Sequence, residues 1–236
     1  MRLPERLFAW VMLGAGAAVT QADPIDLKPF KATFTAEWKG ISAATSTLEL
    51  RRLGPDTYSF ATVNTPHGLF RMALPDSLTQ ASTFKVVDGR IVPLNFGGAD
   101  EKERPIDLKF DWQAKKVTGT AKQHAIDITI PDDAQDPMSL QIASLRNLAK
   151  GTIPATVSLV DGDGKLKDYE LRQEGTARLD TRLGTLDTII YTSRRANSDR
   201  VTRTWVAPAL GYLPVKAERM RGKKVEFTLK LESLDR

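Results

Sequence analysis

The stretch FKATFTAEW, residues Phe30–Trp38, decides the fold of this chain because its hydrophobic side chains occupy every second position. In an extended chain, successive side chains point to opposite faces. The phenylalanines, alanines and tryptophan therefore lie on one face, and the lysine, threonines and glutamate between them lie on the other. This period of two predicts a β-strand with one buried face and one face in water.

The same alternation recurs in residues 106–112, 126–130 and 225–231. Strands that are polar on one face are typical of antiparallel sheets, whereas strands of parallel sheets are apolar throughout. Glycine-rich turn motifs separate the strands and indicate chain reversals. These motifs are Gly54-Pro55-Asp56, Asp88-Gly89, Gly97-Gly98, Asp161-Gly162-Asp163-Gly164 and Arg221-Gly222-Lys223. Many short strands at this spacing predict a mainly β fold, a single large antiparallel sheet that curls into an open or closed β-barrel.

One segment departs from the strand pattern and predicts an amphipathic helix. After Asp136-Pro137-Met138-Ser139, the apolar residues of 140–148 are spaced as on one helix face. Asp136 can accept hydrogen bonds from the first backbone N–H groups, and Gly151 is suited to end the helix. We expect this helix to divide two strand sets, residues 30–130 and 155–234, and either to plug an open end of the barrel or to lie across the concave face of the sheet.

The N-terminus predicts export from the cytoplasm. Residues 1–22 combine two early arginines, an uncharged apolar run and the small residues Thr20 and Ala22 before a cleavage point, which is typical of a secretory signal peptide. We therefore expect a signal peptide at 1–22, a single β-domain at 23–236 and a periplasmic location. The chain has no cysteine, which excludes disulfides, thiolate metal sites, cysteine nucleophiles and a lipid-modified cysteine.

Three local patterns, in this order, resemble the DUF3108 family of exported bacterial proteins. They are Phe34-Thr-Ala-Glu-Trp38, the helix entry Asp136-Pro137-Met138-Ser139-Leu140, and Trp205-Val-Ala-Pro208 followed by Leu213-Pro214-Val215-Lys216. The resemblance spans nearly all of residues 23–236. It implies a curled antiparallel sheet around a helix, similar to periplasmic lipoprotein carriers, and it brings no established catalytic residues.

Aromatic side chains near the ends of the apolar segments are candidate ligand-binding residues. A curled sheet of many strands encloses space that side chains or a ligand must fill, and aromatics are common in apolar sites. An ordinary packed core is the alternative interpretation. The candidate lining residues are Phe34, Trp38, Phe60, Phe110, Trp112, Trp205 and Tyr212.

Basic residues become frequent toward the C-terminus of a chain whose formal net charge is +5. On adjacent hairpins they would form a patch for anionic headgroups or polysaccharide, although solvated strand faces explain them equally well. The candidate patch comprises Arg194, Arg195, Arg203, Arg219, Arg221, Lys223 and Lys224. We expect no nucleic-acid partner in the cell envelope.

The motifs of known enzymes are weak in this sequence. His67 lies in a turn and His124 precedes a strand, and the chain lacks the Gly-x-Ser-x-Gly motif. The Asp161–Gly164 run lacks the further ligands of a calcium loop and is interpreted as a hairpin turn. The carboxylates alternate along water-facing strands and form no evident catalytic pair. We therefore expect no catalytic residues, no metal and no cofactor.

The sequence favours a non-enzymatic exported protein that binds an apolar or amphipathic envelope ligand, such as a lipid or lipid-linked glycan. The first alternative is a protein–protein interaction module in cell-envelope assembly. A hydrolase acting on glycans or esters is the second alternative.

Overall fold

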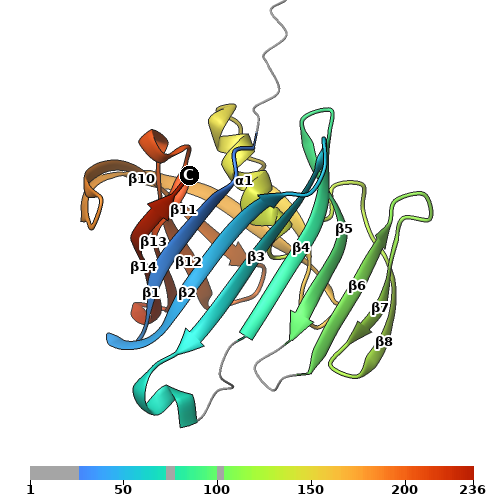
Figure 1. Cartoon of the computed structure of the whole chain (residues 1–236), viewed down its shortest axis with the longest axis horizontal. Helices are drawn as coiled ribbons and strands as arrows, with labels where there is room; N and C mark the ends of the chain where they lie inside the picture. The colour runs from blue at the N-terminus through green and yellow to red at the C-terminus, as the bar shows by residue number, and fades with distance from the viewer. Residues whose placement is uncertain (1–26, 73–77, 100–103) are drawn as a thin grey trace, which may run out of the picture.

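A computed structural model describes residues 27–72, 78–99 and 104–236, and within them the strands form one antiparallel sheet (Figure 1). The strands of the first half are β1 (Phe30–Trp38), β2 (Ile41–Arg52), β3 (Thr57–Pro66), β4 (Leu78–Val87), β5 (Arg90–Ala99), β6 (Pro105–Asp111), β7 (Lys116–Ala121) and β8 (His124–Thr129). Those of the second half are β9 (Thr156–Val160), β10 (Leu166–Thr181), β11 (Gly184–Arg195), β12 (Arg200–Ala207), β13 (Leu213–Arg221) and β14 (Lys224–Asp235). The predicted mainly β class is confirmed.

The first and last strands pair with each other in the middle of the sheet. β1 lies antiparallel to β14, with Ala32 opposite Leu234 and Ala36 opposite Leu229. From this central pair the sheet extends through β2 to β8 on one side and through β13 to β9 on the other. The two strand sets predicted from the sequence are therefore the two halves of one sheet.

The sheet curls until its edge strands β8 and β9 face each other, and we call this junction the seam. The edges form no shared strand ladder in the described residues, so the barrel is open. Gln135, in the link between β8 and α1, lies alongside β9, because its N–H donates to the Ser158 carbonyl (2.9 Å) and its carbonyl accepts from the Val160 N–H (2.8 Å). An ion pair between Lys122 and Asp163 joins the turns at one end of the seam.

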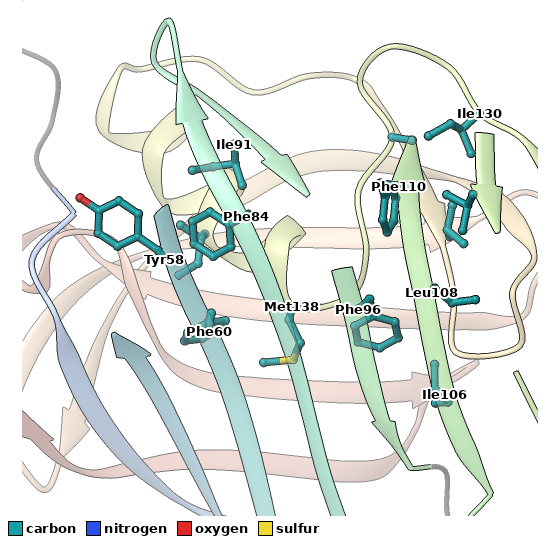
Figure 2. Close-up of a cluster of buried hydrophobic side chains, with 14 of the residues drawn as sticks. Tyr58, Phe60, Phe84, Ile91, Phe96, Ile106, Leu108, Phe110, Ile130 and Met138 are labelled. Carbon is teal, nitrogen blue, oxygen red and sulfur yellow. The ribbon is translucent and has the colours of Figure 1, made fainter. Parts of the chain in front are cut away.

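The only α-helix of the described residues, α1 (Ser139–Ala149), lies inside the curl of the sheet (Figure 1). Its position confirms the predicted helix, and Gly151 follows it with a positive φ of 69°. Ile142 is fully buried against a cluster of side chains from β2 to β7 and β9. Figure 2 shows Phe60, Phe84 and Phe96 of neighbouring strands directed into this interior beside Met138. The alternation read from the sequence thus creates the surface on which the helix packs.

A second core cluster lies under the other half of the sheet. Phe34 and Trp205 belong to it, together with Leu213, Val215 and Leu231. Phe30, Leu48 and Leu145 contact both clusters, so the apolar interior continues from one half of the sheet to the other.

Glycines within strands mark close approaches between neighbouring backbones. The predicted reversal at Gly97-Gly98 is wrong, because β5 continues through both residues. Gly98 has φ of 140°, and a Cβ there would overlap the Thr79 carbonyl oxygen of β4. In the same way, a Cβ on Gly119 would overlap the Asp107 carbonyl oxygen of β6. The other four predicted turns lie between strands as expected.

The predicted signal peptide at 1–22 lies outside the described residues, and the single domain at 23–236 stays a prediction. In the part of the chain that is described, the helices are too short and too polar to span a bilayer.

Candidate functional site

A pocket of about 190 Å³ lies between α1, the β4–β5 turn and the start of β9, and we call it the helix pocket. Its walls include Ile91, Trp112, Gln135, Ala143, Arg146 and Val157. Trp112 presents an indole ring whose N–H already donates to the Pro93 carbonyl (2.7 Å) and whose plane stacks on Phe110. The ring therefore offers the pocket a fixed apolar surface.

Arg146 gives the helix pocket a buried positive charge. Its side chain shares the buried stripe of α1 with Ser139 and Ile142, and the residue is only 3% exposed. Burial lowers the pKa of the Arg146 guanidinium, and the nearby Tyr58 phenol acts in the opposite direction. An arginine keeps its proton in proteins, so a cation lies at the pocket wall.

Gln135 gives the same pocket a hydrogen-bond acceptor. The residue is 8% exposed, its Nε2 donates to the Ile91 carbonyl (3.0 Å), and both of its backbone groups bond to β9. Its Oε1 is buried and has no hydrogen-bond partner among the described residues. Buried polar atoms usually have a partner, so this enclosed and unmatched acceptor is an unusual feature of the pocket wall.

Asp136 fixes the start of the helix to the sheet. Its Oδ1 accepts from the backbone N–H groups of Met138 (2.8 Å) and Ser139 (2.9 Å), and its Oδ2 accepts from the Ser82 hydroxyl of β4 (2.6 Å). Burial raises the pKa of this fully enclosed carboxyl, and the hydrogen bonds from Ser82, Ser139 and Met138 act in the opposite direction. The side chain closes the helix N-terminus as predicted, and the bond to Ser82 was not foreseen.

Four of the aromatic residues predicted to line a ligand cavity are packed in the two core clusters. Phe34, Phe60, Phe110 and Trp205 are between 1% and 8% exposed. Phe60 and Phe110 surround the helix, and Phe34 and Trp205 lie under the other half of the sheet.

The remaining three aromatic candidates lie apart from one another. Trp112 lines the helix pocket. Trp38 is 37% exposed at the end of β1, and Tyr212 lies in the turn before β13 with a positive φ of 63°. The structure thus brings one predicted residue to the pocket, and the ligand-binding role of all seven stays a prediction. Gln135 and Arg146 were missed.

The predicted basic patch is divided by acidic partners. Arg203 forms a two-pronged ion pair with Glu174, whose Oε2 accepts from its Nε at 2.6 Å. Arg194 lies 3.8 Å from Glu170.

The rest of the predicted patch lies toward the ends of neighbouring hairpins. Arg195 is exposed at the end of β11, and Arg219 lies over the Phe227 ring. Arg221 pairs with Asp199 at 3.3 Å, and Lys223 and Lys224 are exposed at the β13–β14 turn. The anion-binding role of the patch stays a prediction.

The histidines and the acidic turn show local structural contacts. His67 Nε2 lies 2.7 Å from the Thr45 hydroxyl, and His124 is the first residue of β8 rather than preceding the strand. Asp161 Oδ1 accepts from the N–H groups of Asp163 and Lys165, as in a hairpin turn. Within the described ranges, no three His, Cys, Asp or Glu side chains are grouped as metal ligands would be.

A second hollow, of about 480 Å³, lies where the β10–β11 turn meets β1, β13 and β14. Its walls carry charges that are mutually paired. Glu37 pairs with Lys230 (2.6 Å), and Glu232 pairs with Arg182 (3.3 Å) and accepts from the Thr35 hydroxyl (2.8 Å). Satisfied charges at a water-accessible surface do not by themselves indicate a ligand.

An open antiparallel sheet rolled around one helix, with a pocket beside that helix, places the chain among β-barrel-like proteins. A family model described as a protein of unknown function (DUF3108) matches residues 33–229, and the chain belongs to that family. The resemblance seen in the sequence is thereby confirmed. No curated protein matches the chain significantly.

Several solved structures are similar to this chain, and the first of them shares its fold. The β-barrel-like DUF1849 protein of Brucella abortus matches with a TM-score of 0.61 and 11% identity, covering 89% of this chain and 98% of that chain. The MucA/MucB complex of Pseudomonas aeruginosa matches with a TM-score of 0.39 and 13% identity, over 88% of this chain and 51% of that one. A candidate exported protein with a YmcC-like fold from Bacteroides fragilis matches with a TM-score of 0.38 and 11% identity, over 89% and 97%.

Proposed function

We propose that this protein is a non-catalytic periplasmic binding protein whose helix pocket holds one end of an amphipathic envelope molecule. An anionic or carbonyl group of the ligand contacts Arg146, a donor group contacts Gln135 Oε1, and an apolar part lies on Trp112. The observation that carries the proposal is that a buried cation and an unpartnered buried acceptor line one pocket, whose walls also include the apolar Ile91, Trp112 and Val157 and the charged Arg90, Asp132 and Asp133. The buried acceptor gains from a ligand donor that replaces lost water contacts.

The size of the helix pocket limits what it can enclose. Its volume of about 190 Å³ is below the ~300–1,000 Å³ of sites that enclose a drug-sized ligand. The pocket therefore accepts a headgroup or a chain end, and the remainder of a lipid or lipid-linked glycan stays outside it. The well-packed aromatics of the two clusters then support the sheet rather than contact the ligand.

Export supports the choice of ligand class. The predicted signal peptide at 1–22 delivers the protein to the periplasm, where amphipathic molecules must cross water between two membranes. A rolled sheet with an interior helix is one architecture that can shield part of such a molecule from water.

Binding of dodecyl phosphate, measured by titration calorimetry, tests the proposal. Arg146→Met removes the charge and keeps most of the side-chain volume. We expect it to weaken binding about tenfold or more, since hydrogen bonds to a charged group contribute ~1.5–3 kcal/mol. Ala143→Phe fills the pocket and is expected to abolish binding, whereas Ala149→Phe on the exposed face of α1 is the matched control and leaves it unchanged.

Two results would overturn the proposal. One is the absence of dodecyl phosphate binding to the unmodified protein, and the other is equal binding by the Ala143→Phe and Ala149→Phe variants. Native mass spectrometry of protein taken from the periplasm separates the alternatives. A carrier yields bound lipid, and a protein-docking module yields a stoichiometric protein partner.

A further inference from the structure

One end of the sheet combines exposed apolar side chains with basic residues. The β1–β2 turn and the short helix η1 (Gly68–Met72) project side by side at this end (Figure 1). Exposed fractions there reach 63% for Ile41, 83% for Leu69 and 86% for Met72, and Trp38 is 37% exposed. Single exposed apolar side chains are common, but four on two adjacent turns form a patch that marks an interaction site.

Hydrogen bonds hold the turns of this end together. The His67 N–H donates to the Ala43 carbonyl (2.8 Å), which places η1 beside the start of β2. The Lys39 N–H donates to the Glu226 carbonyl (3.0 Å), which places the β1–β2 turn beside the start of β14. The patch is therefore presented on a structured edge of the sheet.

Positive charge surrounds the apolar patch. Lys39 Nζ lies 5.6 Å from the Trp38 ring centroid, and Lys223 and Lys224 are exposed at the adjacent β13–β14 turn. Glu226 at this end is already matched, because it lies 3.8 Å from both Arg200 and Arg221. Exposed lysines are attracted to an anionic lipid surface.

We propose that this end, which we call the docking end and define by Trp38, Lys39, Ile41, Leu69, Met72, Lys223 and Lys224, binds the surface of an anionic lipid bilayer. The apolar side chains enter the headgroup region, where tryptophan is favoured, and the lysines contact lipid phosphates. A soluble phosphate would meet the lysines alone, so the combination selects a bilayer. The docking end lies on turns opposite to those around the helix pocket, so binding of a bilayer there does not depend on the pocket.

Co-sedimentation with vesicles tests the apolar part of the docking end. The protein is used as the producing cell matures it, with equimolar phosphatidylglycerol and phosphatidylcholine in the vesicles and pure phosphatidylcholine as the reference. The Ile41→Ser, Leu69→Ser double variant is expected to lower the partition coefficient about tenfold or more. The control is Leu53→Ser with Leu183→Ser, which removes exposed leucines (59% and 39%) from turns at the opposite end and leaves binding unchanged.

The charge part is tested by reversing lysines. Lys223→Glu with Lys224→Glu is expected to lower binding to the anionic vesicles more than tenfold, and added salt is expected to lower binding of the unmodified protein. Lys28→Glu with Lys109→Glu changes the net charge equally at exposed sites elsewhere, and we expect only a small effect.

The proposal is overturned if the unmodified protein fails to bind the anionic vesicles or binds pure phosphatidylcholine equally well. It is also overturned if either control pair lowers binding as much as its test pair. Cross-linking of Leu69 to a single protein in intact cells, without vesicle binding, would assign the docking end to a protein partner instead.

Discussion

Removing the hydroxyl of Ser82 is expected to loosen the attachment of α1 to the sheet. Ser82 is fully buried on β4, and its Oγ donates to Asp136 Oδ2 at 2.6 Å. In Ser82→Ala the carboxylate loses a donor at a site that water cannot reach. Ser46→Ala is the matched control, because Ser46 is also a buried serine but lies 3.4 Å from its Thr62 partner.

The structure sets the expected magnitudes. A hydrogen bond to a charged group contributes ~1.5–3 kcal/mol, so Ser82→Ala is expected to lower the free energy of unfolding by about 2 kcal/mol. The long contact of Ser46 predicts a loss of less than ~1 kcal/mol for Ser46→Ala. Asp136→Ala leaves three buried donors without an acceptor. At ~1–3 kcal/mol for each donor, it is expected to cost about 4 kcal/mol.

Urea unfolding followed by circular dichroism measures these differences. The double variant Ser82→Ala, Asp136→Ala completes a double-mutant cycle. It is expected to be no less stable than Asp136→Ala, because the Ser82 hydroxyl has then already lost its acceptor. Equal losses for Ser82→Ala and Ser46→Ala, or additive losses in the cycle, would refute the reasoning.

The pH dependence of the same site follows from the raised pKa of Asp136. A carboxyl whose pKa is higher in the folded state binds more protons when folded, so its contribution to stability falls as pH rises above the ordinary value of 3.8. Asp136→Asn has no such titration. The stability of Asp136→Asn relative to the unmodified protein is therefore expected to increase from about pH 4 upward, and a constant difference in urea unfolding between acid and neutral pH contradicts this.

Two further predictions concern the close strand contacts and the seam. Gly119→Ala is expected to lower the free energy of unfolding by more than ~2 kcal/mol, since the new Cβ meets the Asp107 carbonyl at a positive φ. Gly175→Ala has open space around it and is expected to change stability by less than ~1 kcal/mol in the same urea assay, so equal losses contradict the argument. Lys122→Ala is expected to cost less than ~1 kcal/mol, because its ion pair with Asp163 is water-accessible. Lys122 lowers the pKa of Asp163, so this small loss is present above the ordinary carboxyl range and disappears as pH falls below it. Thermal unfolding at several pH values measures this effect. A loss of stability in Lys122→Ala that persists in acid contradicts the expectation.

The sequence predicted the sheet because alternation reports which side chains are buried. Residues 30–37 and the strands β6 and β8 follow this rule in the structure. It is wrong at Trp38, which is 37% exposed where β1 ends, and at Thr228 of β14, which is buried. Gly97-Gly98 was misread because the same residue type serves a hairpin turn and a close contact between strands. Only the position of Thr79 on β4 distinguishes the two.

The candidate site was harder to predict because it depends on contacts between distant segments. Gln135 meets Ile91 across the helix pocket, and neither residue carries a motif. Arg146 offered one usable signal, since it follows Ile142 by four residues and therefore shares its helix face. A charged residue on the buried face of a helix could have been selected as a site residue from the sequence.

The central pairing of β1 with β14 has a consequence for how the chain folds. In space the strands run from β9 to β14 and then from β1 to β8, so each is followed by its sequence neighbour except at the junction of the two termini. A circular permutant that links residue 236 to residue 27 and opens the chain near Gly151 converts the sheet into an uninterrupted up-and-down meander. Its contact order is lower, and we therefore expect it to refold faster than the natural chain. In the natural chain, β1 and β14 can pair only after segments separated by nearly the whole sequence have met.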